Sequence, residues 1–180
     1  MLYNAALDGD SDCGGVVNFN YFSGEPVSHT EDGRPMFLRS QNCNFNLPNF
    51  MRAQIYSTIA TLKLGMEILE NENAKIDCLM GHGGLFKTDY VGQRFMAGAM
   101  NTPVTVTKTA GEGGAWGMAV LAAYSVCDSK LPLDEYLRDF VFADCESTTV
   151  EPVASDVEGF NKYMKLYKSA LEVEKSAYKN

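Results

Sequence analysis

The clearest pattern of apolar and polar positions lies between residues 49 and 71. Apolar side chains recur there at intervals of three and four residues, which draws one apolar stripe along a helix. The stripe consists of Met51, Ile55, Ile59, Leu62, Met66 and Leu69. Asn49 is a suitable N-cap for this helix. The polar run ENENAK, residues 70–75, ends the helix as a turn.

A second region alternates strand and helix patterns. Ile76–Met80 is a short apolar run that leads into a glycine turn, and Val104–Thr107 is a second β-branched run. Tyr90–Met100 has a helical pattern, and Gly113–Val126 predicts a helix of small residues that packs closely on a neighbour. The order strand, helix, strand, helix predicts a right-handed crossover and a parallel sheet covered by helices. The predicted fold class is therefore α/β.

The two ends of the chain are less regular. Residues 1–48 are rich in Gly, Asn and Asp, and the aromatic clusters at Val16–Phe22 and Met36–Leu38 indicate loops with a hairpin. Leu133–Val141 predicts a short helix, and the apolar spacing from Val157 to Leu171 predicts a final amphipathic helix with lysines on its solvent side. Since no repeat or linker interrupts the chain, residues 1–180 are expected to form a single domain.

Composition excludes several classes of protein. The 180 residues carry 15 Lys and Arg against 23 Asp and Glu, a net charge of −8, and 46% of them are hydrophobic. These values are typical of a packed globular protein and exclude a disordered chain. We expect no nucleic-acid partner, because nonspecific binding to phosphates needs a basic surface.

The sequence also bears on the compartment. The longest apolar run, Ala115–Tyr124, is about half of the ~20 residues that a membrane span needs, so it predicts a buried helix and no membrane contact. The N-terminus has no signal-peptide pattern. Five widely spaced cysteines without a Cys-x-x-Cys pair indicate reduced thiols, not a disulfide framework or a zinc site. A cytoplasmic protein is expected.

An acidic pattern near the N-terminus fails as a metal motif. Asp8, Asp10 and Asp12 resemble the start of an EF-hand loop, which then requires Gly at its sixth position and Glu at its twelfth. Cys13 and Phe19 stand at those two positions. A solvated acidic turn is therefore the favoured interpretation, and no metal site is expected.

The run Gly81–Thr88 resembles a Walker A loop, but Phe86 stands where glycine must precede the lysine. A weaker hypothesis remains, because a glycine turn after a parallel strand lies where open α/β folds bind ligands. A flat ring could lie against the peptides of Gly83 and Gly84, and the Lys-Thr pair that follows could reach hydroxyls or phosphates. From the pattern alone, nucleotide binding and a simple strand-to-helix turn both remain open.

A second glycine cluster, Gly111–Gly117, opens the small-residue helix with free amide groups. Anion binding is one interpretation. Close packing of the helix on a strand, helped by Ala119, Ala122 and Ala123, is the favoured one. For His82, within the glycine turn, a role in lining a site and a role in the turn are both open.

The run from Asp77 to Tyr124 resembles the C-terminal signature of the FGGY carbohydrate kinases, which include gluconate, glycerol, xylulose and ribulose kinases. The signature is a double-glycine turn, a helix that carries Gln, a strand opened by Pro-Val and a small-residue helix. The corresponding pieces here are Gly83-Gly84, Thr88, Gln93, Pro103-Val104, Thr109 and Ala115–Ala119. Asn49–Ala53 is similar to the helix that precedes this strand in the family. The pieces follow in order, at nearly the family's spacing, over residues 45–125.

The resemblance implies a ribonuclease-H-like, actin-like ATPase fold, with this chain as part of the C-terminal lobe and a mainly parallel sheet flanked by helices. It divides the chain into a loop-rich entry segment (1–48), an adenosine-binding core (49–126) and C-terminal helices (127–180). In the family, the double-glycine turn receives the adenosine of ATP. The implied cofactor-binding residues are Gly81, Gly83, Gly84, Lys87 and Thr88. His82 departs from the family, where many relatives carry Asp, and the spacing from Gly84 to Pro103 is about one residue longer than usual.

Parts of a complete FGGY kinase have no counterpart in these 180 residues. The chain has neither an Asp-x-Gly-Thr phosphate loop nor any Gly-Thr dipeptide. The resemblance therefore implies a fragment without a catalytic residue, inactive alone and dependent on a missing N-terminal lobe. The parent reaction would transfer the γ-phosphoryl group of ATP, with Mg²⁺ on the phosphates, to a hydroxyl of a ketopentose or related polyol.

Two further expectations concern partners. The expected ligands are ATP or ADP and the sugar, and apolar surface that the other lobe normally covers would favour association of the chain with itself. The alternative is a non-catalytic module of the actin-like ATPase superfamily that binds a nucleotide or a protein partner.

Overall fold

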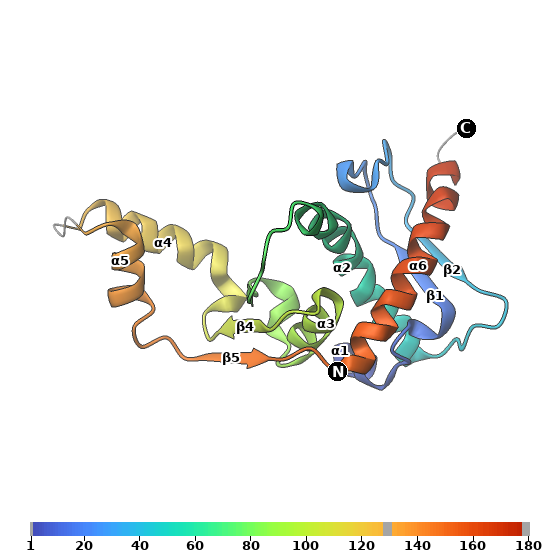
Figure 1. The fold of residues 1–180 in the computed structure, drawn as a ribbon, viewed down its shortest axis with the longest axis horizontal. Coiled ribbons are helices and arrows are strands. Elements are labelled where there is room, and N and C mark those ends of the chain that lie inside the picture. Colours follow the sequence, from blue (N-terminus) through green and yellow to red (C-terminus); the bar gives the residue numbers. More distant parts are fainter. Residues whose placement is uncertain (1, 128–130, 178–180) are drawn as a thin grey trace.

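The computed structural model describes residues 2–127 and 131–177. Figure 1 shows a body that contains both ends of the chain and an arm that carries α4 and α5 away from it. The body contains α1 (Leu2–Ala5), β1 (Val16–Phe19), β2 (Met36–Arg39), α2 (Leu47–Asn71), α3 (Val91–Met100) and α6 (Ala154–Ala177). The strands β3 (Leu79–Met80), β4 (Val104–Thr107) and β5 (Ser147–Val150) join the body to the arm.

The remaining helical segments are short. The arm consists of α4 (Gly113–Ser125) and α5 (Leu133–Tyr136), which continues as a π-helical stretch over Leu137–Val141. Single 3₁₀ turns occupy Ala6–Asp8, Cys13–Gly15, Pro26–Ser28, Gly84–Lys87 (η4) and Ala110–Glu112 (η5). None of the described helices combines the length and the apolar character that a membrane crossing requires.

The described strands form two small sheets. β1 and β2 make the antiparallel hairpin that the aromatic clusters of residues 1–48 predict. β3 lies parallel to β4, with Leu79 opposite Val104, which confirms the predicted crossover pair. β5 then joins β4 in the antiparallel sense, so this sheet is mixed, where the resemblance implied a mainly parallel one.

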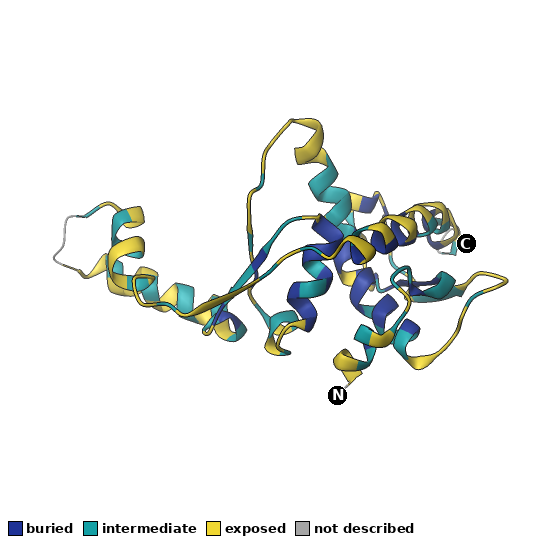
Figure 2. Cartoon of the chain, turned by 60° about the horizontal axis from the view of Figure 1, so that its bottom comes forward, coloured by how far each residue is buried: buried dark blue, intermediate teal, exposed yellow. Residues whose placement is uncertain are grey.

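The hydrophobic core lies where α2, α3 and α6 meet β1 (Figure 2). Aromatic rings fill it, with Tyr56 at the centre in edge contact with Phe95, Phe160 and Tyr163. Edge-to-face pairs of this kind add to the stabilisation that burial provides. The core draws on segments from Ala6 to Leu171, so the start and the end of the chain fold together.

The long helix α2 follows the predicted apolar stripe but begins earlier. Asn46, not Asn49, is the N-cap, and its side chain accepts a hydrogen bond from the Asn49 N–H at 2.8 Å. Asn49 is fully buried, and its side chain accepts from the Asp10 N–H and donates to the Asp10 carboxylate. A proline in the first turn favours the earlier start, because it needs no hydrogen bond from its nitrogen there.

The acidic turn that resembles an EF-hand is held by protein groups. The Asp10 carboxylate accepts hydrogen bonds from Asn49 and Asn44, which lower its pKa. The Asp12 side chain accepts from the Gly14 N–H at 3.0 Å. Among residues 2–127 and 131–177, no three His, Cys, Asp or Glu side chains gather into a metal site.

Helix α4 departs most from the sequence expectation. It forms over the predicted residues, but none of its residues is buried, and Ala119, Ala122 and Ala123 are exposed. The Trp116–Phe142 and Tyr124–Tyr136 ring pairs join α4 to the other helical stretch of the arm, and its first residue, Gly113, lies against His82. The predictions of a buried helix and of close packing on a strand are therefore wrong here, because α4 projects away from the body (Figure 2).

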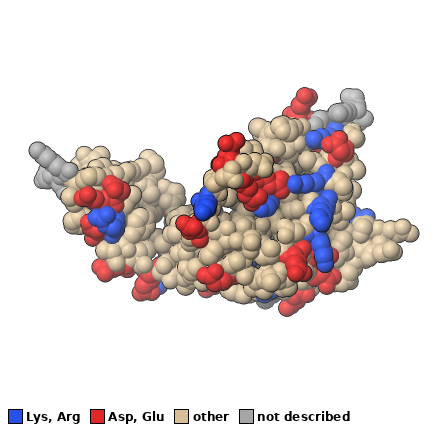
Figure 3. Space-filling view, viewed as in Figure 1, with Lys and Arg blue, Asp and Glu red and all other residues tan. Residues whose placement is uncertain are grey.

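The C-terminal helix α6 forms as predicted and extends further in both directions. Phe160, Tyr163 and Tyr167 are buried against the body, whereas Lys162 and Lys165 are exposed. Figure 3 shows Lys and Arg side chains in a column over α6, with acidic side chains scattered elsewhere on this face. The helix therefore has the amphipathic character that its spacing predicts.

Candidate functional site

The glycine turn follows β3 at the carboxyl end of the parallel strand pair. The Gly81 N–H donates to the Thr105 carbonyl at 2.8 Å and so extends the pairing of β3 with β4. Two residues later, the Gly83 N–H donates to the Ala110 carbonyl at 2.8 Å, and the Phe86 N–H donates to the Gly83 carbonyl at 3.1 Å. These bonds fix the turn between β4 and η5, at the edge of the sheet where α/β folds bind ligands.

The three glycines of the turn have different physical roles. Gly81 is buried, and a Cβ there would lie 2.6 Å from the Phe86 ring, so only glycine lets that ring pack. Gly83 has φ +97° and ψ −171°, a conformation that is essentially restricted to glycine. Around Gly83 and Gly84, by contrast, nothing lies within 4 Å of a built Cβ. The turn therefore presents open backbone at these two residues.

Lys87 and Thr88, the other two residues that the resemblance implies, lie at the end of η4. The Lys87 Nζ pairs with Glu112 Oε1 at 2.7 Å, and both side chains are largely exposed. Its hydrogen bond and charge lower the pKa of the Glu112 carboxyl. Thr88 has extended backbone between η4 and α3. The five predicted residues share one turn, in which Gly83 and Gly84 present open backbone, Lys87 an exposed ion-paired side chain, and Gly81 a buried contact with Phe86.

The second glycine cluster lies against the first. A Cβ at Gly113 would lie 2.6 Å from His82 Nδ1, and one at Gly111 would lie 3.3 Å from the Lys87 side chain. Gly114 and Gly117 have nothing within 4 Å. Close packing therefore explains part of this cluster, through His82 and Lys87 of the glycine turn and not through a strand.

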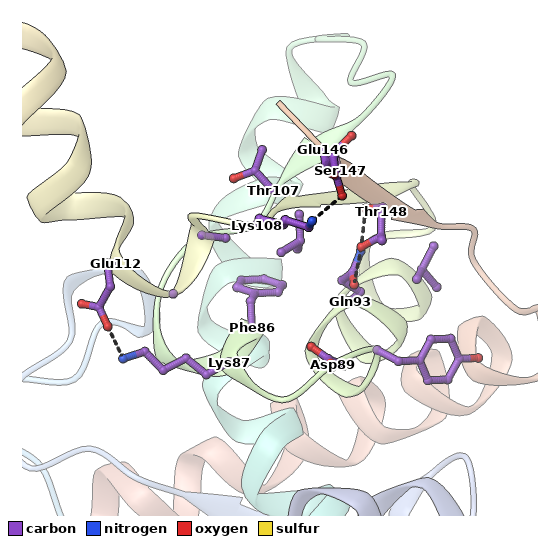
Figure 4. A pocket seen from close by; sticks show the side chains of 15 residues that line it. Phe86, Lys87, Asp89, Gln93, Thr107, Lys108, Glu112, Glu146, Ser147 and Thr148 are labelled. Atoms are coloured by element: carbon purple, nitrogen blue, oxygen red, sulfur yellow. Dashed lines mark hydrogen bonds and ion pairs between the residues drawn. The ribbon is translucent and has the colours of Figure 1, made fainter. Parts of the chain in front are cut away.

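A cavity of about 860 Å³ adjoins the turn, between η4, the start of α3 and the ends of β4 and β5 (Figure 4). Figure 4 shows the Phe86 ring at its centre, with the Lys87–Glu112 and Lys108–Glu146 ion pairs on its sides. Its lining also includes Asp89. The size lies within the range of small-molecule sites.

Gln93 holds the frame of this cavity together. Its side-chain amide donates to the Val104 carbonyl of β4 at 3.1 Å and to the Thr148 carbonyl of β5 at 2.9 Å. The Thr148 hydroxyl donates to Gln93 Oε1 at 3.4 Å. The glutamine that the family signature places on this helix is thus a clamp between α3 and two strands.

Sequence reasoning missed the part of the cavity that comes from Asp89 and from β5. The run Ser147–Val150 contains β-branched residues that favour a strand, but its side chains are mostly exposed and show no apolar alternation. Asp89 lies next to the predicted Lys-Thr pair, and nothing in its local pattern separates it from an ordinary exposed carboxylate. Only the folded chain brings the two segments together.

Comparison with known proteins identifies the family. The profile described as "FGGY family of carbohydrate kinases, C-terminal domain" matches residues 1–126. The chain belongs to this family. No curated protein sequence matches the chain.

Solved structures agree in fold. Gluconate kinase from Lactobacillus acidophilus superposes over 98% of this chain and 35% of its own, with a TM-score of 0.73 at 20% identity. Xylulose kinase from Rhodospirillum rubrum covers 98% of this chain and 34% of its own, with a TM-score of 0.69 at 19% identity. Plasmodium falciparum glycerol kinase with ADP superposes over 96% of this chain and 33% of its own length, with a TM-score of 0.66 at 18% identity. This FGGY chain therefore spans about a third of the length of these kinases.

The fold class is confirmed by these matches. The FGGY chain has the ribonuclease-H-like, actin-like ATPase architecture, with an α/β body and a mixed sheet. The parallel β3–β4 pair and the glycine turn that follows it belong to this family's C-terminal domain, since residues 1–126 match it.

Proposed function

We propose that this chain is the C-terminal, adenosine-binding part of an ATP-dependent kinase that phosphorylates a hydroxyl of a ketopentose or related sugar or polyol. The observation that carries the proposal is the open glycine turn at Gly83 and Gly84, within a domain of the FGGY carbohydrate kinase family. The similarity to a glycerol kinase solved with ADP supports the nucleotide part. The sugar class rests on the similarity to gluconate, xylulose and glycerol kinases.

In this proposal the turn contributes position and not covalent chemistry. A nucleotide can lie against the peptides of Gly83 and Gly84 because no side chain occupies that space. Lys87 lies four residues from Gly83 on an exposed stem, so it can exchange its partner Glu112 for a ribose hydroxyl or a phosphate oxygen. Holding the nucleotide in line with the acceptor hydroxyl is a large part of phosphoryl-transfer catalysis.

The proposal assigns no catalytic residue and no metal ligand to this chain. Mg²⁺ supplies charge neutralisation on the phosphates in such kinases. The described residues contain no cluster of three side chains that suits it. We therefore expect the chain alone to produce no ADP from ATP when sugar is added, because the base and the phosphate loops belong to the rest of such a kinase.

The test is a glycine substitution that changes the open space and nothing else. Gly84→Ala should fold normally, since its backbone is not in the left-handed region and a Cβ meets no atom. That Cβ occupies the space proposed for the nucleotide, so ADP affinity measured by calorimetry should fall by about ten-fold, a methyl clash in a closely fitted site. Gly65→Ala, in the middle of α2 and in ordinary contact with Val27, is the matched control.

The two variants separate a binding surface from a structural turn. Gly65→Ala should bind ADP as the wild-type chain does. If Gly84→Ala also binds ADP with unchanged affinity, the nucleotide does not lie on the glycine turn. Failure of the wild-type chain to bind ADP would contradict the proposal as well.

A further inference from the structure

We infer that the loop between β1 and β2, residues 20–35, is held on α6 by a proton-dependent contact. Neutral Glu174 holds the end of this hairpin loop through Arg34, and ionised Glu174 releases it. The inference is independent of the proposed function, because neither residue belongs to the glycine turn or lines the cavity beside it.

The start of the hairpin loop is anchored by hydroxyl groups. The Tyr21 hydroxyl lies 2.7 Å from the Tyr167 hydroxyl of α6 and 2.9 Å from the Thr61 hydroxyl of α2. Burial raises the pKa of Tyr167 above its usual range, and threonine does not titrate. This anchor should therefore remain in place from pH 4 to pH 8.

The end of the hairpin loop contacts α6 through a side chain that can ionise. The Arg34 N–H donates a hydrogen bond to Glu174 Oε1 at 2.8 Å, while the Arg34 side chain is exposed. Gly33 packs against the start of the loop, since a Cβ there would lie 2.5 Å from the Tyr21 carbonyl oxygen. The hydrogen bond to Glu174 thus links this end of the loop to the C-terminal helix.

Glu174 favours its neutral form for a geometric reason. It is fully buried, and Oε2 has no partner among the described residues. Arg34 is the charged group that faces it from the loop, and Tyr167 is its titratable neighbour on α6. Lys175, the next residue on the helix, pairs with Glu172. Burial raises the pKa of Glu174, and the hydrogen bond and charge of Arg34 offset this only in part.

Ionised Glu174 is solvated only if Oε2 reaches water. Tyr167 and Leu171 lie on the same face of α6 and are buried in the core, so the helix is fixed there. The exposed end of the loop is the side that can move. The contact should therefore be complete below the ordinary pKa of glutamate, and be lost as the pH rises through the raised one.

Nuclear magnetic resonance of the ¹⁵N-labelled 180-residue chain tests the inference from pH 4 to pH 8. The proteins are the wild-type chain, Glu174→Gln and the control Glu172→Gln, whose exposed carboxylate lies two residues away on the same helix. The amide proton shift of Arg34 distinguishes two outcomes of ionisation. A hydrogen bond kept to a charged acceptor becomes stronger and moves this proton downfield, whereas release moves it upfield.

In the wild-type chain and in Glu172→Gln, the Arg34 amide proton should move upfield as the pH rises. The order parameters of residues 31–35 should fall with the same midpoint, from about 0.85 to below about 0.6. Signals of the core residues should stay in place. Glu174→Gln should show neither change, because its side-chain oxygen accepts the same hydrogen bond at every pH.

The wild-type titration alone can overturn the inference, so the test does not depend on the folding of a variant. A downfield shift with unchanged order parameters would show that ionised Glu174 keeps the loop. Absence of any transition, or one that spreads over the signals of the whole chain, would exclude a local proton-dependent contact. The same transition in Glu174→Gln would assign it to another group.

Discussion

At the scale of single residues, the body depends on one buried carboxylate that joins three helices. Asp156, at the start of α6, accepts from Arg52 Nη2 at 2.5 Å and from Arg94 Nε at 2.7 Å. Burial alone would raise the pKa of Asp156, but the hydrogen bonds from Arg94 and Arg52 and their charges outweigh it and lower the pKa. The Arg52 side chain is itself 1% exposed, so its charge needs this partner.

Asp156→Ala should therefore destabilise the fold by about 3 kcal/mol, because it leaves the buried Arg52 charge without its counter-ion. Urea unfolding followed by circular dichroism measures the loss. Glu67→Gln removes a pair with Lys168 that is partly exposed, and it should change the unfolding midpoint little. A small effect of Asp156→Ala would mean that water reaches Arg52.

A second buried carboxylate has the opposite pH dependence. Glu174 on α6 is fully buried, and its Oε1 accepts from the Arg34 N–H at 2.8 Å, while Oε2 has no partner among the described residues. Burial raises the pKa of Glu174, and the hydrogen bond and charge of Arg34 offset this only in part. The folded state thus holds the proton more tightly than the unfolded state. Stability should then fall as the pH rises from the ordinary pKa of glutamate through the raised one.

Glu174→Gln should remove this decline, because the side chain stays neutral at every pH and can still accept from Arg34. The measurement is the free energy of unfolding from pH 4 to pH 8 for the wild-type chain and the variant. Glu172→Gln, two residues away on the same helix and largely exposed, is the control and should keep the wild-type slope. A wild-type slope in Glu174→Gln would exclude Glu174 as its source.

Some residues of the glycine turn can be identified from the sequence alone, and others only from the structure. Gly83 and Gly84 could be singled out from the sequence, since two glycines after an apolar run predict an open turn. The separate roles of Gly81, which admits Phe86, and of Gly113, which admits His82, could not. They depend on side chains that meet only in three dimensions. The same holds for Asp89, which lines the cavity together with residues of β4 and β5 only in the folded chain.

At the scale of elements, hydrogen bonds from one side chain of α3 hold this helix to the strands β4 and β5. Gln93 is 6% exposed, and its side-chain amide donates to carbonyls of both β4 and β5. β5 makes no parallel contact of its own and joins the sheet through β4. The position of β5, and with it one wall of the cavity, therefore depends on this glutamine.

Gln93→Leu should destabilise the fold by about 2 kcal/mol, because the buried Val104 carbonyl and the partly buried Thr148 carbonyl lose this donor. The loss should be largest locally, so hydrogen exchange of the β5 amides should accelerate more than that of α2 amides. Gln54→Leu, a glutamine of α2 that is only partly buried, is the matched control. Equal acceleration throughout the chain would contradict a local clamp.

Periodicity predicted the long helices well because each has one apolar face against a common core. In α2, Ile55 and Ile59 of the predicted stripe are buried, whereas Leu62 and Leu69, nearer its end, are exposed. The apolar spacing of α6 corresponds mostly to buried positions, and β4 forms over the predicted residues. The pattern failed for α4, which is apolar on all sides and was expected to be buried. An apolar sequence shows that burial of the helix is favourable, but not whether other residues of this chain bury it.

At the scale of the whole molecule, the chain is a body that carries an open glycine turn, proposed to receive a nucleotide, and an apolar arm. Met118 and Leu121 of α4 are 68% and 47% exposed, in a helix without a charged residue. The FGGY kinases that match it in fold are about three times as long. Family and fold could be recognised from the sequence because the signature pieces lie in order along one segment. The cavity could not, since its walls come from residues about 60 positions apart.

The central claim is that the glycine turn is a half-site for adenosine, and an ADP titration of the ¹⁵N-labelled chain tests it most directly. Ribose 5-phosphate serves as the control ligand, because it lacks the base. We expect amide shifts confined to Gly81–Thr88 and the neighbouring residues of η5 and α3 with ADP, and none with the control. Shifts spread over the chain, equal shifts with ribose 5-phosphate, or no shifts at millimolar ADP would contradict an adenosine half-site at this turn.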